Sequence, residues 1–180
     1  MGASLTSYAI RGKSPETVLQ DFGLQKARDK NRKTRFCGGP LSGGWYLIKY
    51  GRHEFTDKEM VRLSQGCEVV ACFVEEHVMV SRAAAWKDGR EIWSVTHDSQ
   101  EDLRHLEARG DLPAGFAAIR DDLTRQQEED AEDEENACDF MFDIPVTLAA
   151  EIADYRYDEM REGKFETLEK PSLMQQLFGR

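Results

Sequence analysis

The spacing of apolar and polar residues along the chain predicts a mixture of strands and helices. Short runs rich in β-branched and aromatic residues are typical of strands, whereas apolar residues three and four positions apart are typical of one buried helix face. We therefore expect strands at residues 5–10, 45–50, 69–74 and 140–142, and helices at 15–22, 57–63, 114–129 and from 143 onward.

Residue signals at helix ends support two of these helices. Ser14 before Pro15 is typical of a helix start, because the hydroxyl accepts a backbone N–H and proline tolerates the first helical position. Thr56, followed three residues later by Glu59, forms a capping-box pattern. The first helix is predicted to end at Gly23, since glycine tolerates the left-handed conformation of a helix terminus.

Residues 68–98 contain the strongest strand signal, with Asp88-Gly89 near their middle. An Asp-Gly pair between apolar runs predicts a two-residue type I′ hairpin turn. Pairing outward from this turn predicts four cross-strand pairs, namely Trp86 with Glu91, Ala84 with Trp93, Arg82 with Val95 and Val80 with His97. In that register Arg82 lies among bulky apolar residues, where its guanidinium needs a carboxylate or an aromatic ring as partner.

Together these elements predict one α+β domain over residues 1–180. We expect an antiparallel sheet of about four to six strands, with the Asp88-Gly89 hairpin at its centre, packed by about three to five helices. Three segments look different from the rest: a flexible basic, glycine-rich loop at 26–44, an acidic segment at 128–139 and a polar C-terminal tail at 155–180.

Charge is distributed unevenly along the 180 residues, which carry a formal net charge of −10. Residues 1–60 hold eleven Lys and Arg against six Asp and Glu, whereas residues 61–180 hold thirteen against twenty-eight. The acidic residues concentrate in the segment 128–139, at the predicted C-terminus of a helix, where carboxylates oppose the helix dipole. Folding preference therefore does not explain their position.

The chain has no apolar run long enough to span a membrane, and its N-terminal residues lack the apolar block of a secretory signal. Four irregularly spaced cysteines in a chain of this size are typical of free thiols in a reducing compartment. We expect a cytoplasmic protein that makes no membrane contact.

We expect the acidic segment to capture a basic protein. Opposite charge raises the rate of encounter, which suits an inhibitor or immunity-type protein that neutralises a basic toxin. Neither a cofactor nor a metal is predicted, because no phosphate-binding loop is complete and the His and Cys spacing does not match a zinc site. The partner-binding candidates are Glu128, Glu129, Asp130, Glu132, Asp133, Glu134, Glu135 and Asp139.

One alternative is a small enzyme with its site at the rim of the sheet. It would use His97 or His77 as a general base, together with Glu75 or Glu76. This function requires a concave site in which polar groups converge.

A second alternative is nucleic-acid or nucleotide binding through residues 26–35. This stretch is basic and is followed by Phe36, so it offers phosphate contacts beside an aromatic ring. The net charge of −10 repels a long polyanion, which makes nucleic acid an unfavoured partner.

Overall fold

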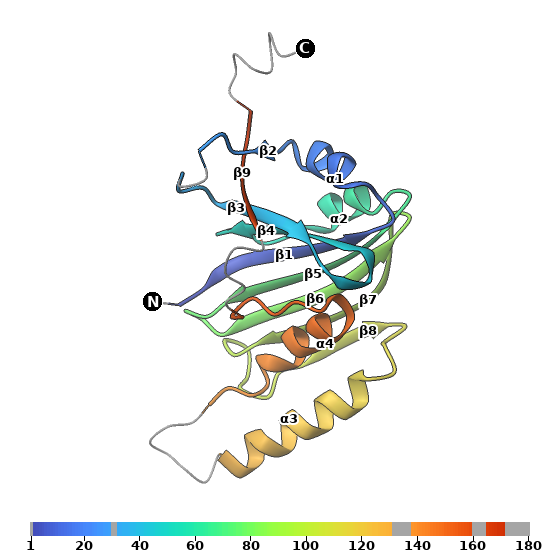
Figure 1. The fold of residues 1–180 in the computed structure, drawn as a ribbon. Helices are drawn as coiled ribbons and strands as arrows, with labels where there is room; N and C mark the ends of the chain where they lie inside the picture. Colours follow the sequence, from blue (N-terminus) through green and yellow to red (C-terminus); the bar gives the residue numbers. More distant parts are fainter. Residues whose placement is uncertain (1, 30–31, 131–137, 160–164, 172–180) are drawn as a thin grey trace.

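The computed structural model describes residues 2–29, 32–130, 138–159 and 165–171 (Figure 1). Within these ranges nine strands form one antiparallel sheet in the order β2-β9-β3-β4-β1-β5-β6-β7-β8. The α+β class is confirmed, but the sheet is larger than the four to six strands predicted. The strands are β1 Ser4–Arg11, β2 Gln25–Lys26, β3 Phe36–Pro40, β4 Trp45–Gly51, β5 Glu68–Glu75, β6 Val80–Lys87, β7 Arg90–Asp98, β8 Glu107–Gly110 and β9 Glu166–Glu169.

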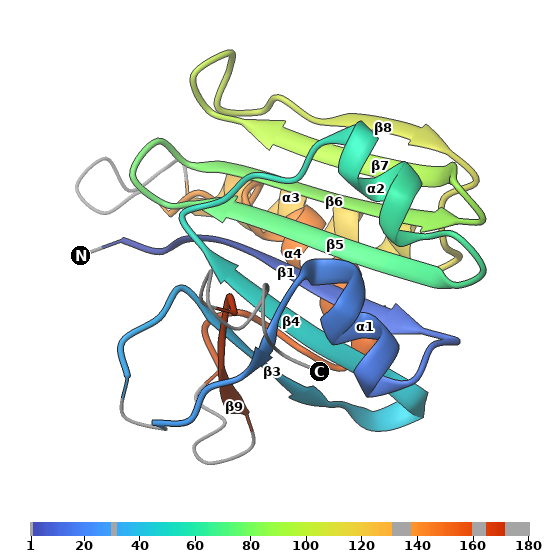
Figure 2. The same ribbon diagram turned by 90° about the horizontal axis from the view of Figure 1, so that it is seen from above.

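Helices cover both faces of the sheet. Figures 1 and 2 show α1 and α2 on one face and α3 and α4 on the other. Each face has its own apolar core, which contains Val18 and Met60 on the α1–α2 side and Phe116 and Ile144 on the α3–α4 side. The helices described are α1 Pro15–Phe22, α2 Asp57–Leu63, α3 Phe116–Asp130 and α4 Asp143–Ala153, with a 3-10 turn at Ser42–Gly44.

The predicted helix-end signals are confirmed. The Ser14 hydroxyl accepts a hydrogen bond from the backbone N–H of Thr17, and Gly23 ends α1 in the left-handed conformation. The Thr56 hydroxyl accepts from the Glu59 N–H at the start of α2. Both helices therefore begin where their sequences place a hydroxyl to receive an unpaired backbone donor.

The central hairpin is confirmed, but its register changes two residues from the turn. Asp88 and Gly89 both have positive φ, as a type I′ turn requires, and Trp86 pairs with Glu91 as predicted. A bulge after that pair leaves Ile92 without a partner, so Ala85 pairs with Trp93. The predicted pairs beyond it are wrong by one residue; the structure instead pairs Ala83 with Val95, Arg82 with Thr96, Ser81 with His97 and Val80 with Asp98.

The bulge gives Arg82 other neighbours on β7 than the ones predicted. A one-residue slip moves side chains to the opposite face of a strand pair, so Trp93 and Val95 lie in the α3–α4 core, whereas Trp86 stays with Arg82 on the α1–α2 face. The Arg82 guanidinium lies 4.6 Å from the centre of the Phe55 ring and 3.0 Å from the Asp57 carboxylate. Arg82 thus has two partners, an aromatic ring and a carboxylate, and it does not stack on a tryptophan of the hairpin.

Part of the loop expected at 26–44 is strand. Residues 36–40 pair with β4 on one side and β9 on the other. The glycines that suggested a loop fit this strand because the sheet is crowded there: a Cβ at Gly38 would clash with the Leu47 carbonyl oxygen and touch the Leu168 side chain. Glycine therefore serves close packing at this position.

The tail expected at 155–180 contains β9, which lies between β2 and β3 in the sheet. Its Leu168 side chain is fully buried against the α1–α2 core. In contrast, the strand predicted at 140–142 is wrong, since these residues form a turn that leads into α4. The Asp139 carboxylate accepts the Phe142 N–H, which closes that turn instead of leaving it extended.

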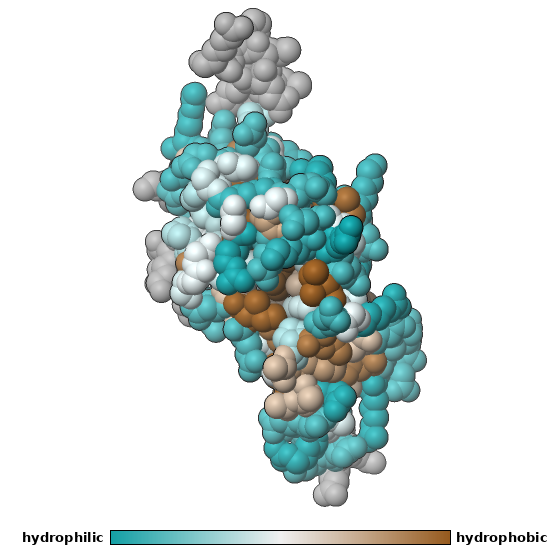
Figure 3. All heavy atoms as spheres, turned by 90° about the vertical axis from the view of Figure 1, so that its right-hand side faces the viewer, coloured by the Kyte–Doolittle hydropathy of each residue, from teal (hydrophilic) through white to brown (hydrophobic). Residues whose placement is uncertain are grey.

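The face of the molecule drawn in Figure 3 is mostly hydrophilic, with one apolar region. Figure 3 shows apolar side chains gathered near the middle of the side that lies on the right in Figure 1. The large apolar residues most exposed among those described are Val61, Val78, Ile92 and Leu103. No helix within the described ranges is long and apolar enough to span a membrane.

Candidate functional site

The described members of the acidic segment are engaged within the protein itself. Glu129 pairs with Arg125 at 2.8 Å, and Glu128 lies 3.7 Å from Arg104. The Asp130 carboxylate accepts the Cys138 N–H. The remaining candidates Glu132, Asp133, Glu134 and Glu135 lie outside the described residues.

Asp139 faces inward and binds His97, so it is not part of an open docking surface. The His97 ring is fully buried, with Nε2 3.1 Å from the Asp139 carboxylate and Nδ1 2.7 Å from the His105 carbonyl oxygen. Because a carbonyl oxygen and an ionised carboxylate only accept, this geometry favours a proton on each ring nitrogen, which is the imidazolium form. Burial acts to lower the pKa of His97, but the bonds to Asp139 and His105 outweigh it and the pKa is raised.

Carboxylates gather instead in a hollow of about 420 Å³ over the α1–α2 face of β6, β7 and β8. Two arginines share this acidic hollow: Arg82, paired with Asp57, and Arg109, paired with Glu107. The charges of the lining therefore leave a surplus of three negative charges. The five carboxylates are Glu54, Asp57, Glu91, Asp98 and Glu107.

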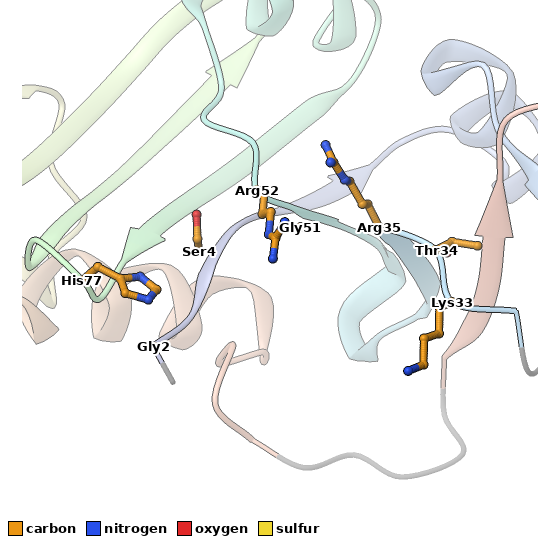
Figure 4. Close-up of a pocket in the computed structure, with 8 residues that line it drawn as sticks. All are labelled: Gly2, Ser4, Lys33, Thr34, Arg35, Gly51, Arg52 and His77. Carbon is orange, nitrogen blue, oxygen red and sulfur yellow. The ribbon is translucent and has the colours of Figure 1, made fainter.

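A larger hollow, of about 690 Å³, lies at the strand ends nearest the N-terminus, and Figure 4 shows the residues that line it. We call it the basic hollow, because Lys33, Arg35, Arg52 and His77 line it. These side chains come from three segments: the stretch before β3, the residue after β4, and the turn between β5 and β6. Figure 4 shows Arg52 between Ser4 and the 33–35 stretch, from which Lys33 and Arg35 point in opposite directions.

Three cations of the basic hollow have no ion-pair partner within the part of the chain that the structure describes. No ion pair among the described residues includes Lys33, Arg35 or Arg52. Three basic residues thus line one hollow in a protein whose net charge is −10.

Backbone hydrogen bonds hold these segments together. The Arg52 N–H donates to the Ser4 carbonyl oxygen, and the Gly51 N–H donates to the Arg35 carbonyl oxygen, each at 2.7 Å. Arg52 itself has a φ of 56°, a left-handed conformation that costs a non-glycine residue about 1 kcal/mol or more. The fold therefore holds this arginine at the hollow in a conformation that its residue type disfavours.

A histidine and a carboxylate meet at the rim of the basic hollow. His77 Nδ1 lies 2.6 Å from Glu75 Oε1, and the His77 side chain is 58% exposed. The hydrogen bond from the Ser4 side chain outweighs the effect of burial and, with the bonds from His77, lowers the pKa of Glu75. This ionised carboxylate orients the imidazole beside the unpaired cations.

The other residues of the enzyme alternative lie elsewhere. Glu76 accepts hydrogen bonds from the Ala3 N–H and the Tyr157 hydroxyl, and His97 is buried. Within the described ranges no group of three or more His, Cys, Asp and Glu side chains is placed to hold a metal ion.

Sequence reasoning located only part of the basic hollow. Lys33 and Arg35 belong to the basic stretch 26–35, and His77 and Glu75 to the enzyme alternative. Arg52 was missed because a lone arginine after a strand carries no signal. Arg52 reaches the basic hollow because β1 pairs with β4, which places Gly51 opposite Leu5.

Comparison with known proteins adds no relative: no protein-family model, curated protein or solved structure matches this chain.

Proposed function

We propose that this protein is a binding protein that holds a phosphate-bearing anion in the basic hollow. The observation that carries the proposal is that Lys33, Arg35 and Arg52, none with an ion-pair partner among the described residues, all line one hollow of about 690 Å³. A volume of this size is within the usual range for small-molecule sites. Lys33 and Arg35 belong to the stretch 26–35, for which the sequence left nucleic-acid or nucleotide binding open.

The residue types suit phosphate. An arginine guanidinium offers parallel N–H donors that match two phosphate oxygens, whereas a lysine acts as a mobile point charge. Most of the acidic residues lie in the part 61–180, whereas Lys33, Arg35 and Arg52 lie before it. A small anion held by these cations therefore avoids most of the repulsion that a long polyanion would meet. His77 at the rim adds a donor or acceptor that Glu75 keeps in place.

Arg52→Gly is expected to weaken the binding of pyrophosphate at least about tenfold, or about 1.4 kcal/mol. Glycine adopts the positive φ of this position readily, so the variant removes the guanidinium and relieves backbone strain. The measurement is an NMR titration of the protein with pyrophosphate at low salt.

Arg90→Gln serves as the control, since Arg90 is exposed and lies beside the hairpin turn. This substitution changes the net charge by the same amount as Arg52→Gly. Equal affinities of wild type and Arg52→Gly for pyrophosphate would contradict the proposal, as would an equal loss in Arg90→Gln.

A second candidate function is capture of a basic protein, of which an immunity-type inhibitor of a toxin is one form. The acidic hollow favours it, with five carboxylates over β6, β7 and β8. A concave surface of one charge sign raises the local concentration of an oppositely charged partner. On this candidate the docking surface is the acidic hollow, since the described members of the segment 128–139 are engaged internally.

We expect the triple variant Glu54→Gln, Glu91→Gln and Glu107→Gln to weaken the binding of a deca-lysine peptide at low salt several-fold, because three charges leave one surface. Fluorescence anisotropy of the labelled peptide measures the effect. The matched control neutralises Glu128, Glu129 and Asp130 and should bind the peptide like wild type. If the control bound more weakly than the triple variant, the docking surface would instead lie at the end of α3.

A further inference from the structure

The basic hollow has a neighbour, a second hollow of about 330 Å³. The two share Lys33, Thr34 and Arg35, so they lie side by side along the stretch before β3. The second one, which we call the aromatic hollow, adds Arg32, Phe36, the β9 residue Glu169 and Lys170, which follows β9. The stretch before β3 therefore separates two neighbouring spaces of different chemistry.

Phe36 in the aromatic hollow is held firmly by other rings. Its ring lies 4.4 Å from that of Tyr50, which in turn stacks on His53 at 4.1 Å with an angle of 15° between the planes. Lys170 Nζ lies 5.9 Å from the centre of the Phe36 ring. A half-buried ring supported from behind is a suitable platform for a flat aromatic group, because stacking needs a fixed face.

The two hollows share the cations Lys33 and Arg35 and differ in what lies beside them. The aromatic hollow adds Phe36, Lys170 and the Arg32–Glu169 ion pair at 2.6 Å, in which the Glu169 side chain is 10% exposed. That carboxylate can accept N–H groups from a neutral ring. The basic hollow adds Arg52, a cation without an ion-pair partner among the described residues. The position of Phe36 thus fixes the direction in which a ligand with one anionic and one aromatic end would lie, with its ring at Phe36 and its anionic end among Lys33, Arg35 and Arg52.

We propose that the ligand of this site is a mononucleotide, with its phosphate in the basic hollow and its base against Phe36. This inference rests on the proposed function and adds the class of ligand. A mononucleotide fits better than a nucleic-acid strand, because residues 61–180 carry thirteen basic against twenty-eight acidic residues and repel an extended polyanion.

The test compares the affinities of AMP, ribose 5-phosphate and pyrophosphate for the full chain by NMR titration at low salt. We expect AMP to bind about tenfold more tightly than ribose 5-phosphate, since stacking of one base on an aromatic side chain gives effects of about this size. Phe36→Leu should abolish this tenfold difference and leave the affinity for ribose 5-phosphate unchanged. The matched control is Phe165→Leu, which changes a ring that contacts Tyr155 and lines neither hollow.

The outcomes separate the two proposals. If pyrophosphate binds and AMP binds no more tightly than ribose 5-phosphate, the nucleotide inference is overturned and the anion site stands. If none of the three binds, both fail. Tighter binding of an eight-nucleotide oligo-dT than of AMP overturns the mononucleotide in favour of a strand. Thermal melting of Phe36→Leu checks that the variant is folded. If it is not folded, the wild type is titrated with an AMP analogue that carries a blocking group at the edge of its base. Loss of the tight binding, with the affinity for ribose 5-phosphate unaffected, then supports the base site.

Discussion

Replacing Asp139 with Ala is expected to lower the free energy of unfolding by about 3 to 5 kcal/mol near pH 6. His97 is fully buried and positively charged, so removing the carboxylate leaves a buried cation with one unpaired N–H. The change also removes the acceptor for the Phe142 N–H at the turn before α4. Urea unfolding followed by tryptophan fluorescence measures the loss.

The loss should depend on pH in one direction. The pKa of His97 is raised: burial lowers it, but the hydrogen bonds to Asp139 and to the His105 carbonyl, with the charges of Asp139 and Asp98, outweigh burial. The stabilisation is therefore complete below about pH 6.5, the usual pKa of an unfolded histidine, and disappears as the pH rises through the folded pKa. The difference between wild type and Asp139→Ala should accordingly shrink towards pH 9.

A matched control is Glu101→Ala, which removes an exposed carboxylate 3.4 Å from His105 and should change stability by less than about 1 kcal/mol. An Asp139→Ala variant that is as stable as the control at pH 6, or a difference from wild type that grows with pH, would show that His97 is neutral in the fold.

Leu168→Ala should lower the free energy of unfolding by about 2 to 5 kcal/mol. Its side chain is fully buried between β3 and the α1–α2 core, and its removal leaves a cavity beside Gly38. Denaturant unfolding measures this effect as well.

Glu166→Ala is the control on the same strand, because Glu166 is exposed and its pair with Lys26 is at the surface. A Leu168→Ala variant as stable as Glu166→Ala would mean that β9 contributes little to the sheet.

Local signals in the sequence predicted the elements that local chemistry determines. Ser14, Thr56 and Asp88-Gly89 act on their own neighbours, and the structure confirms all of them. The bulge at Ile92 could not be predicted, since it depends on how β7 packs against its neighbours rather than on the turn. One unpaired residue was enough to give Arg82 the wrong predicted partner on β7.

Elements that depend on distant partners were missed. β3 contains Gly38-Gly39-Pro40, a composition typical of loops, and becomes a strand because β4 and β9 flank it. β9 has one buried apolar residue, Leu168, which is too little for a periodic signal. The site follows the same rule: Lys33 and Arg35 form a visible basic stretch, but Arg52 joins them only through the pairing of strands.

The short edge strands of the sheet limit strand pairing between two copies of this protein. Its outermost strands, β2 at Gln25–Lys26 and β8 at Glu107–Gly110, expose two and four residues of backbone. Charged side chains at Lys26, Glu107 and Arg109 flank these short stretches. A second chain would find few free amide groups to extend the ladder, which discourages growth into fibrils. The sheet therefore offers a second chain little backbone at its margins, even though its interior strands are rich in valine and aromatic residues.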